Sequence, residues 1–480
     1  MFNRIAAFRI LPSVVSLAII FGLLFSMSFS SFNSAYGLPA SQPLIGDTVT
    51  IPAMQKSLPV ITDGDDATIC DVAIDPTTNR LYISASNGIL YIMKQNFNVT
   101  SDTDHDNVDN GNHLLTQLST IDLGRGSCTS EIAINTRSNM IYVANTNITT
   151  DSLYVIDGQS NKVVEQISLA DNNQTLQSFP STVASQTSIG INPLSNRVYV
   201  NFGIPTITYP GNSPEYGTAF RYIYKTSVID GNTNTILDEN LTGVEGGPNI
   251  IAVDAELGKV YFAHTNARLN HSITIMKEGS DSNHTLGVLK KIEDMNGDVH
   301  SMAVNPTNNK LYVDTFDIYS PHENIINVID GKTNEIIKSI TLSNGTEGEE
   351  VYSFPSFGGQ WMDITVNPNT NTVYATNMFL GTLYVIDSST DKLVNRIETK
   401  ADSSQLSFPD GANTAPIRVD TEYSSNSVYI LHANSKAISL ITGSEVLPEF
   451  GTSLAVVMVA MSVMITLAVA SKYSLNQRTK

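Results

Sequence analysis

The feature that most constrains the fold is one segment that recurs seven times, at intervals of about 50–60 residues, a spacing typical of propellers and solenoids. Each copy joins a short apolar strand, a turn of Asn or Asp with Pro and polar residues, and a second strand centred on Tyr. Asn, Asp, Pro and Ser favour turns through preset φ angles and side-chain bonds to the backbone. The copies occupy residues 71–84, 131–145, 189–201, 250–264, 301–314, 363–377 and 417–431.

A second repeated segment follows four of these copies, at 153–164, 227–237, 326–337 and 383–394. It supplies a third strand, a turn of the Asp-Gly or Ser-Ser-Thr type and a fourth strand such as 162–169. Four short antiparallel strands per unit make a β-propeller blade, and blades bury their faces by packing around an axis. We therefore predict an all-β fold, a seven-bladed β-propeller of four-stranded blades spanning residues 46–443.

One tyrosine recurs in every copy, and we expect these tyrosines to pack between blades because aromatic residues favour half-buried strands. The seventh copy has only three strands. The segment 47–55 reads as a lone strand, so we predict that it completes the last blade and leaves no open edge. The tyrosines are Tyr82, Tyr142, Tyr199, Tyr261, Tyr312, Tyr374 and Tyr429.

The repeats resemble those of the YVTN family of β-propellers, whose units run roughly "iavNPtTnklYVaN…vsVIDgaTnkvv". IYVAN (141–145) and VYATN (373–377) are closest to this signature, and the resemblance covers about residues 45–443. It implies a propeller of bacterial or archaeal envelopes, used mostly for binding and display, with no shared catalytic residues.

Both ends of the chain carry targeting patterns. Arg4 and Arg9, an apolar run and a small-residue exit at Gly37 predict a signal peptide over 1–37, followed by a linker at 38–45; an uncleaved anchor is the alternative. The uncharged run from Leu454 to Ala470 predicts a transmembrane helix at 454–471. The tail at 472–480 is basic, so we expect it to stay in the cytoplasm.

The linker at 444–453 contains Pro-Glu-Phe-Gly, and with the helix and basic tail it resembles the PEF-type C-terminal sorting signals of archaeal surface proteins. The resemblance implies removal of the helix by an archaeosortase-like enzyme and transfer to another envelope anchor. A plain transmembrane anchor is the alternative. Either way, we expect the propeller to be extracytoplasmic, anchored to the cell membrane or envelope surface.

Composition bears on the class of partner, on the cysteines and on possible glycosylation. A net charge of −19 argues against nucleic acid as a partner, because phosphate binding needs Lys and Arg stripes. The two cysteines, Cys70 and Cys128, precede innermost strands of adjacent blades, where either a disulfide or two buried thiols would fit. Seven Asn-x-Ser/Thr sequons are candidate glycosylation sites: Asn98, Asn147, Asn173, Asn240, Asn270, Asn283 and Asn344.

An acidic stretch at 101–113 is the sharpest local motif. Oxygen ligands at every second or third position can wrap Ca²⁺, although Asn107 replaces the glycine usual at the bend. A solvated acidic loop is the alternative, and His105 and His113 would instead suit copper or zinc. The candidate calcium ligands are Asp102, Asp104, Asp106, Asp109 and Asn112.

Strand direction assigns the short, uniform turns to one face and nearly all the long, irregular connections to the other. Residues 202–224 and three Ser-Phe-Pro segments belong to the long connections, and binding usually lies on such loops of a rigid scaffold. Ser-Phe-Pro as a staple that holds a loop over a blade is the alternative. The candidate binding face comprises Phe179, Tyr209, Tyr216, Phe220, Phe354 and Phe408.

Catalytic signals are weak. Asp71, Glu131 and Asp363 share one repeat position and would make one mouth of the propeller acidic. Cys70, His300 and Met362 share the preceding position and are a weak copper candidate. The chain has none of the GxSxG, HExxH, Walker A or GxGxxG motifs. We therefore expect a non-enzymatic binding or structural module of the cell envelope, with its loop-rich face outward and an envelope or extracellular protein or glycan as its partner. The alternative is an extracytoplasmic enzyme, a lactonase-like hydrolase or metal-dependent oxidoreductase, with a site at the channel mouth.

Overall fold

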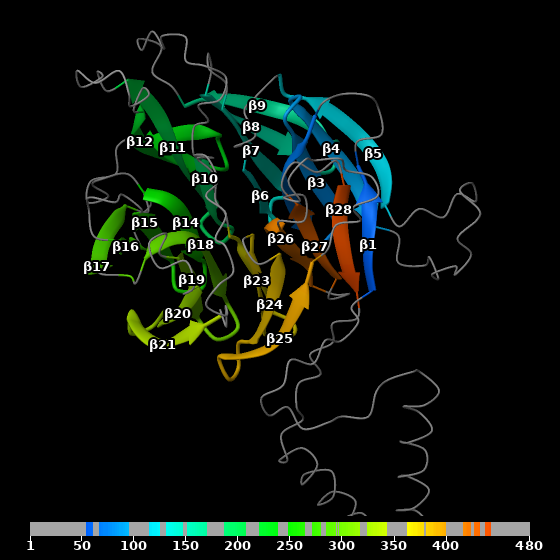
Figure 1. Cartoon of the computed structure of the whole chain (residues 1–480). Coiled ribbons are helices and arrows are strands. Elements are labelled where there is room, and N and C mark those ends of the chain that lie inside the picture. The colour runs from blue at the N-terminus through cyan, green and yellow to red at the C-terminus, as the bar shows by residue number, and fades with distance from the viewer. Residues whose placement is uncertain are drawn as a thin grey trace, which may run out of the picture. The chain divides into compact units, whose positions relative to one another are not determined.

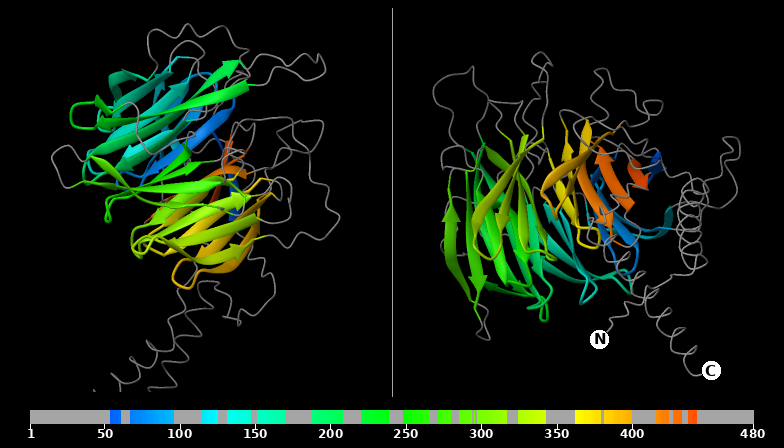
Figure 2. Two further views of the ribbon diagram at one scale, coloured as in Figure 1. Left: turned by 90° about the vertical axis from the view of Figure 1, so that its left-hand side faces the viewer. Right: turned by 90° about the horizontal axis from the view of Figure 1, so that it is seen from below.

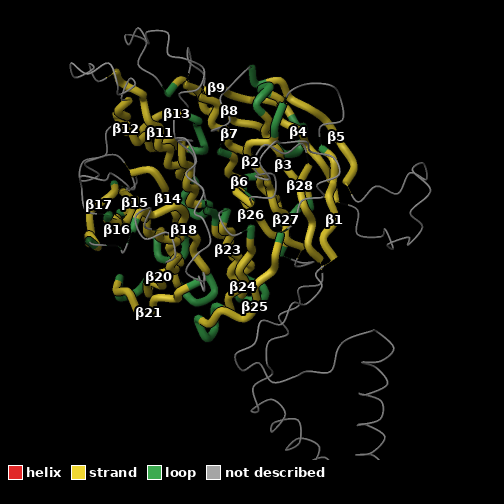
Figure 3. Tube along the Cα trace, in the orientation of Figure 1, coloured by secondary structure: helices red, strands yellow, loops and turns green. Residues whose placement is uncertain are grey.

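The computed structural model is a ring of seven antiparallel sheets, each with four strands (Figure 1). The described part of the chain contains strands and turns but no helix, as Figure 3 shows, and within it nothing is long and apolar enough to form a membrane-spanning helix. The structure describes residues 54–60, 67–95, 115–124, 131–146, 151–169, 187–207, 220–238, 248–264, 271–279, 285–293, 295, 297–316, 324–342, 362–378, 381–399, 416–423, 427–432 and 437–442.

The first four blades follow the chain in order, from the innermost strand outward. Blade 1 holds β2 (Ile69–Asp75), β3 (Arg80–Ala85), β4 (Ile89–Gln95) and β5 (Leu115–Asp122). Blade 2 holds β6 (Ile132–Asn135), β7 (Met140–Thr146), β8 (Asp151–Asp157) and β9 (Lys162–Ser168). Blade 3 holds β10 (Thr187–Asn192), β11 (Arg197–Ile207), β12 (Phe220–Asp230) and β13 (Thr235–Asp238). Blade 4 holds β14 (Pro248–Asp254), β15 (Lys259–His264), β16 (Ser272–Glu278) and β17 (Leu286–Ile292).

The remaining blades close the ring. Blade 5 holds β18 (Asp298–Asn305), β19 (Lys310–Phe316), β20 (Asn324–Asp330) and β21 (Glu335–Thr341). Blade 6 holds β22 (Ile364–Asn367), β23 (Thr372–Asn377), β24 (Thr382–Asp387) and β25 (Lys392–Glu398). Blade 7 holds β26 (Pro416–Glu422), β27 (Ser427–His432), β28 (Ala437–Thr442) and, as its outer strand, β1 (Met54–Pro59). The predicted seven-bladed propeller is confirmed.

The closing strand comes from the N-terminal side, as predicted, but lies further along the chain. β1 pairs antiparallel with β28 from Met54↔Thr442 to Pro59↔Ala437, so it shares only Met54 and Gln55 with the predicted segment 47–55. The other residues of that segment lie outside the described ranges. Residues 47–53 contain the β-branched residues that favour strands, but neither they nor residues 54–59 contain the recurring Tyr. The sequence therefore could not show which of these two adjacent segments pairs with β28.

The recurring tyrosines fill the spaces between blades. All seven have fully buried side chains, and they belong to hydrophobic clusters that combine residues of neighbouring sheets. Tyr312, for example, packs with Tyr384 of blade 6. Its hydroxyl donates to Asp391 Oδ1 at 2.7 Å and also forms a hydrogen bond of 2.7 Å with the Ser388 hydroxyl. The predicted packing role is confirmed.

The turns explain why asparagine recurs. Where a four-residue turn joins two strands, its last residue adopts a left-handed conformation that Asn tolerates better than most residues. Asn79, Asn309 and Asn371 have φ of 55°, 55° and 53°, and Gly258 takes the same position in blade 4 with φ of 56°. In blades 1 to 6 the residue that begins the first turn caps it, as when Asp75 Oδ1 accepts from Thr77 N at 2.9 Å.

The two ends of the ring differ. We call the end with the first-to-second and third-to-fourth strand turns the hairpin end, and the opposite end the connection end; Figure 2 shows the ring from two further sides. At the hairpin end, basic side chains reach the turn of the next blade. Arg80 donates to Gly158 O, Lys259 to Gly331 O, and Lys310 to Ser388 O and Asp391 Oδ2. These turns are therefore occupied by contacts between blades.

We predict that β1 is needed for a stable ring. A chain that begins at residue 60 loses six β1–β28 residue pairs, so its free energy of unfolding should fall by about 5 kcal/mol, at roughly 1 kcal/mol per backbone hydrogen bond. A chain that begins at residue 48 is the matched control. Chemical denaturation of both measures the difference; equal stabilities would contradict the role of β1 in closure.

Candidate functional site

One position of the inner strands carries most of the polar side chains that link each blade to the next. It lies four residues before the residue that begins the first turn of each blade, and we call it the axial position. Consecutive inner strands contact one another all the way round the ring, so side chains at this position meet the next blade. Its occupants are Asp71, Glu131, Ser188, Ile250, Ser301, Asp363 and Arg418.

Axial side chains accept hydrogen bonds from the backbone of the next blade. Asp71 Oδ2 accepts from Ile132 N at 2.8 Å, and Asp363 Oδ2 accepts from Val419 N at 3.0 Å. In each case the donor is the residue that follows the axial position in the next inner strand. An inner strand has no sheet neighbour on its axial side, so these bonds satisfy amides that would otherwise be buried without a partner.

Three further bonds repeat this geometry. Ser188 Oγ accepts from Ile251 N at 3.0 Å, and Ser301 Oγ accepts from Ile364 N at 3.2 Å. The carboxylate of Glu131 accepts from the backbone of Ile189. Five of the seven axial residues therefore join one inner strand to the next.

The junction between blades 7 and 1 is different. The axial residue is Arg418, whose Nε lies 3.4 Å from Asp71 Oδ1. Asp420, two residues further along β26, accepts from Ile74 N through Oδ2 at 2.8 Å and from Thr365 Oγ1 through Oδ1 at 3.3 Å. The guanidinium of Arg418 thus faces an axial carboxylate at the junction between the last and first blades, where the ring closes.

The cluster is strongly acidic. Burial raises the pKa of Asp71 to about 6, against the opposing effect of Arg418. Burial, together with the charge of Asp71, raises the pKa of Glu131 to about 8. Burial also raises the pKa of Asp420 to about 7, and Asp363 adds to the effect. For Arg418, burial lowers the pKa, but Asp363, Asp71 and Glu131 outweigh it and raise the pKa overall.

Asp314 adds a fifth carboxyl near Asp363. It pairs with Ser301 in the β18–β19 register, and Ser301 Oγ donates to Asp363 Oδ1 at 2.9 Å. Asp314 is fully buried, and neither carboxyl oxygen has a hydrogen-bond partner among the described residues. Burial, reinforced by the charge of Asp363, raises the pKa of Asp314 well above its usual range.

The weak copper candidate gains no support. Cys70 is disulfide-bonded, which leaves it no thiolate to offer a metal. Met362 is fully buried and its sulfur accepts from Asn324 Nδ2 at 3.2 Å. Burial, with the nearby charge of His271, lowers the pKa of His300 to about 4. In the part of the chain that the structure describes, no three His, Cys, Asp or Glu side chains are arranged to hold a metal ion.

Most other predicted site residues lie outside the described ranges. They comprise the calcium candidates Asp102, Asp104, Asp106, Asp109 and Asn112, the aromatic residues Phe179, Tyr209, Tyr216, Phe354 and Phe408, and all seven sequons. Cys128, the predicted partner of Cys70, also lies there, so that pairing stays a prediction. Phe220 is described as the first residue of β12 and pairs with Ile207.

The sequence analysis missed Arg418 and Asp420. Asp420 resembles the Asn or Asp that begins the turn in the other blades, and that alignment puts Ala415, instead of Ile417, at the position equivalent to His300. The structure corrects this register: Glu422 pairs with Ser427 and begins the turn. Counting seven residues back from the recurring tyrosine gives Asp75, Asn135 and, in blade 7, Glu422, so that spacing would have revealed Arg418.

Comparisons with known proteins add little to this geometry. No protein-family model matches the chain, and no curated protein matches it. Among solved structures, the chain is similar to the WD40 domain of Pan2 from Neurospora crassa, with a TM-score of 0.48 and 10% identity over 82% of this chain and 98% of that chain.

We predict that acidic pH stabilises the ring. Because the folded-state pKa values of Glu131, Asp420 and Asp71 lie above those of an unfolded chain, the folded state binds more protons between about pH 4 and pH 8. The stabilisation is full below about pH 4 and is lost as the pH rises through these folded-state values.

The free energy of unfolding should therefore fall by several kcal/mol from pH 5 to pH 8.5, with Glu131 contributing most of the change because its pKa is raised furthest. The Glu131→Gln variant should show a shallower fall, whereas Glu165→Gln, which changes an exposed carboxylate of β9, should follow the wild type. Urea titrations across this pH range measure all three. A flat wild-type profile would refute the electrostatic account of the axial cluster.

Proposed function

We propose that this protein is an extracytoplasmic scaffold, tethered at its hairpin end to the cell membrane or envelope, that presents its connection end to a partner. A β-propeller is an architecture that often serves as a binding or structural module. The resemblance of the repeats to the YVTN family supports a place on the cell envelope. The axial carboxylates accept hydrogen bonds between blades, which gives them a role that requires no reaction.

One observation carries this orientation. Met54 and Thr442 are paired Cα partners, and β28 ends at the hairpin end where β1 begins. The segment before residue 54 and the segment after residue 442 therefore both leave the ring at the hairpin end. The predicted signal segment and the predicted transmembrane helix lie in these two segments.

The length of the C-terminal connection strengthens the argument. Eleven residues, 443–453, separate β28 from the predicted helix at 454–471. At no more than about 3.5 Å per residue they span at most about 40 Å. The hairpin end is thus held near the membrane, and the connection end is directed away from it.

The most distinctive element at the connection end is the hairpin of β11 and β12. Its register continues from Phe202↔Lys225 to Ile207↔Phe220, whereas the neighbouring β10 pairs no further than Phe202. We call residues 203–207 with 220–224 the blade 3 ribbon; it projects from the ring in Figure 1. Its sequence contains Ile204, Ile207, Phe220, Tyr222 and Tyr224. Aromatic residues are enriched where proteins bind one another.

We predict opposite accessibility for the two ends. An epitope inserted in the 208–219 connection should be reached by antibody on intact cells, and the same epitope inserted in the 96–114 connection at the hairpin end should be reached about tenfold less, because the membrane limits access. Cells with opened membranes provide the control for total epitope. Labelling of only the 96–114 epitope would reverse the orientation.

We also predict that the blade 3 ribbon carries binding. Replacing residues 204–223 with Asn-Gly leaves Gly203 and Tyr224 joined by a two-residue hairpin turn. Saturable binding of the purified protein to envelope fractions from cells that lack it should fall roughly tenfold, as expected when a central aromatic contact region is removed. A matched variant with a short turn in place of 96–114 should bind as the wild type does. Equal binding by both variants would show that the blade 3 ribbon does not carry the binding.

A further inference from the structure

The outer strands expose a repeated set of apolar side chains. Of the ten large hydrophobic residues that are exposed in the described ranges, all but Leu194 lie on the outermost strands of blades. They are Leu118 on β5, Val163 and Val164 on β9, Leu237 on β13, Val288 and Leu289 on β17, Ile336 and Ile337 on β21, and Leu393 on β25.

A β-bulge lies at or beside these exposed residues in every blade from 1 to 6. The register between the third and fourth strands shifts by one residue near the hairpin end, so one residue of the outer strand has no partner. In blade 5, Ile329 pairs with Ile336 and Val328 with Lys338, which leaves Ile337 as the bulged residue. The bulged residues are Leu118, Val164, Leu237, Leu289, Ile337 and Val394.

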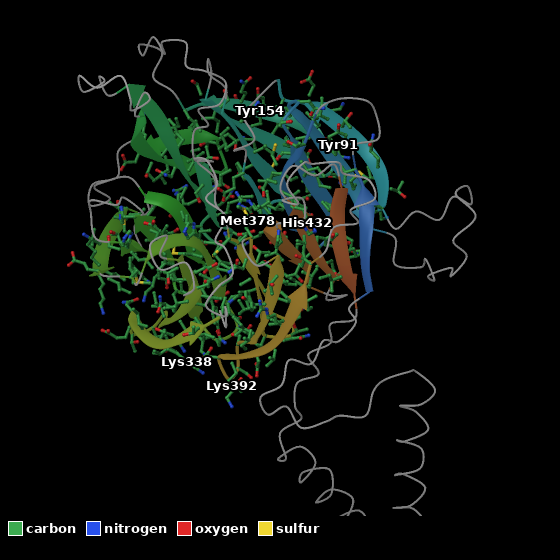
Figure 4. The ribbon with its side chains drawn as sticks, viewed as in Figure 1. Tyr91, Tyr154, Lys338, Met378, Lys392 and His432 are labelled. Carbon is green, nitrogen blue, oxygen red and sulfur yellow. The ribbon has the colours of Figure 1, made fainter. Side chains whose placement is uncertain are left out.

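Charge divides these outer strands into two groups. Strands β17, β21 and β25 contain five basic and two acidic residues, whereas β5, β9 and β13 contain one basic and three acidic residues. The basic residues are Lys290, Lys291, Lys338, Lys392 and Arg396. We call β17, β21 and β25 the outer basic sector; Figure 4 shows Lys338 and Lys392 at its rim. A basic sector stands out in a chain with a net charge of −19.

The charges of the sector are only partly neutralised. Lys290 Nζ pairs with Glu335 Oε1 at 2.6 Å, and Lys291 Nζ pairs with Glu293 Oε1 at 3.2 Å, just beyond the end of β17. Lys338 Nζ donates to Thr390 O at 3.3 Å. Arg396 lies over the ring of Tyr384, with 5.6 Å between its Cζ and the ring centroid. Lys392 is exposed beside Leu393. Exposed apolar residues flanked by lysines suit a surface that offers both negative charge and hydrocarbon.

We propose that the outer basic sector rests on an anionic lipid surface, which fixes the tilt of the propeller above the membrane. This inference depends on the proposed tether. All five of its exposed apolar residues fall within the first four positions of strands that begin at the hairpin end, and the chain leaves Thr442 at that same end. The short connection to the predicted helix keeps this rim within reach of the headgroups.

The sector orients the protein and does not anchor it. Each lysine near an anionic leaflet contributes a small, salt-sensitive attraction, and the exposed fractions of Val288, Leu289 and Ile337 are 53%, 49% and 49%. Contacts of this size are reversible without a second tether. With the tether in place, the local concentration of lipid is high and weak contacts suffice.

The test uses the full chain, one copy per nanodisc, with and without phosphatidylglycerol in a phosphatidylcholine bilayer. A bimane label at Ile337→Cys reports contact with brominated lipids through quenching. The matched label at Leu118→Cys occupies the equivalent bulge on β5, outside the basic sector. Quenching at position 337 should rise roughly threefold with anionic lipid and fall with added salt, while quenching at 118 stays low.

Charge variants sharpen the test. Lys338→Glu with Lys392→Glu should reduce the lipid-dependent quenching at 337 roughly tenfold, because two attractions become repulsions. Lys162→Glu, at the first position of β9 as Lys392 is of β25, should leave it unchanged. Equal quenching at 118 and 337, or no dependence on anionic lipid, overturns the docking proposal.

Two other outcomes separate the alternatives. Shielding of the 337 label in lipid-free detergent that grows with protein concentration would show that a second copy covers the sector, and would overturn the lipid proposal. Failure of the full chain to enter nanodiscs at all would refute the tether, and with it the proposed function. Docking that fails in discs that do hold the protein leaves the proposed function standing.

Discussion

The hydrogen bond from an inner-strand amide to the axial side chain of the preceding blade is the interaction on which the ring depends. Each sheet would otherwise present the unpaired edge of its inner strand to the axis, where neighbouring blades exclude most water. Asp71, Glu131, Ser188, Ser301 and Asp363 remove that cost by accepting one amide each. The same bonds fix the angular relation between successive blades, because each acceptor reaches only the residue after the next axial position.

Carboxylates at these positions are costly, because they are buried and close enough to repel one another. Burial and mutual repulsion push several of their pKa values upward, and a single guanidinium, Arg418, faces three of them. Serine performs the same acceptor role in blades 3 and 5 without charge. The acidity is therefore concentrated around the junctions of blades 6, 7, 1 and 2, where the chain ends meet and where Arg418 compensates part of the charge.

The sequence predicted the blades because each blade repeats the same local chemistry. A four-residue turn needs a residue that tolerates a left-handed φ, so Asn recurs, and a wedge between two sheets needs a large flat side chain, so Tyr recurs. The axial network was harder to predict. Asp71, Glu131 and Asp363 were recognised as equivalent, but their partners are backbone amides of the next blade, which no repeat pattern names. Arg418 was missed because blade 7 begins its turn with Glu422, an unusual residue at a position otherwise held by Asn or Asp.

Departures from the repeat are the most informative features of such a chain. At most positions, the residue types shared by six blades show what packing between blades requires. A residue type found in only one blade or one sector therefore needs another explanation. By that criterion the hairpin end is explained by packing, because Arg80, Lys259 and Lys310 all serve the next blade's turn. The lengthened β11–β12 hairpin and the charge of β17, β21 and β25 are not explained by packing. One departure lies at the connection end and the other on the outer rim toward the hairpin end, which is where a tethered scaffold would meet its partner and its membrane.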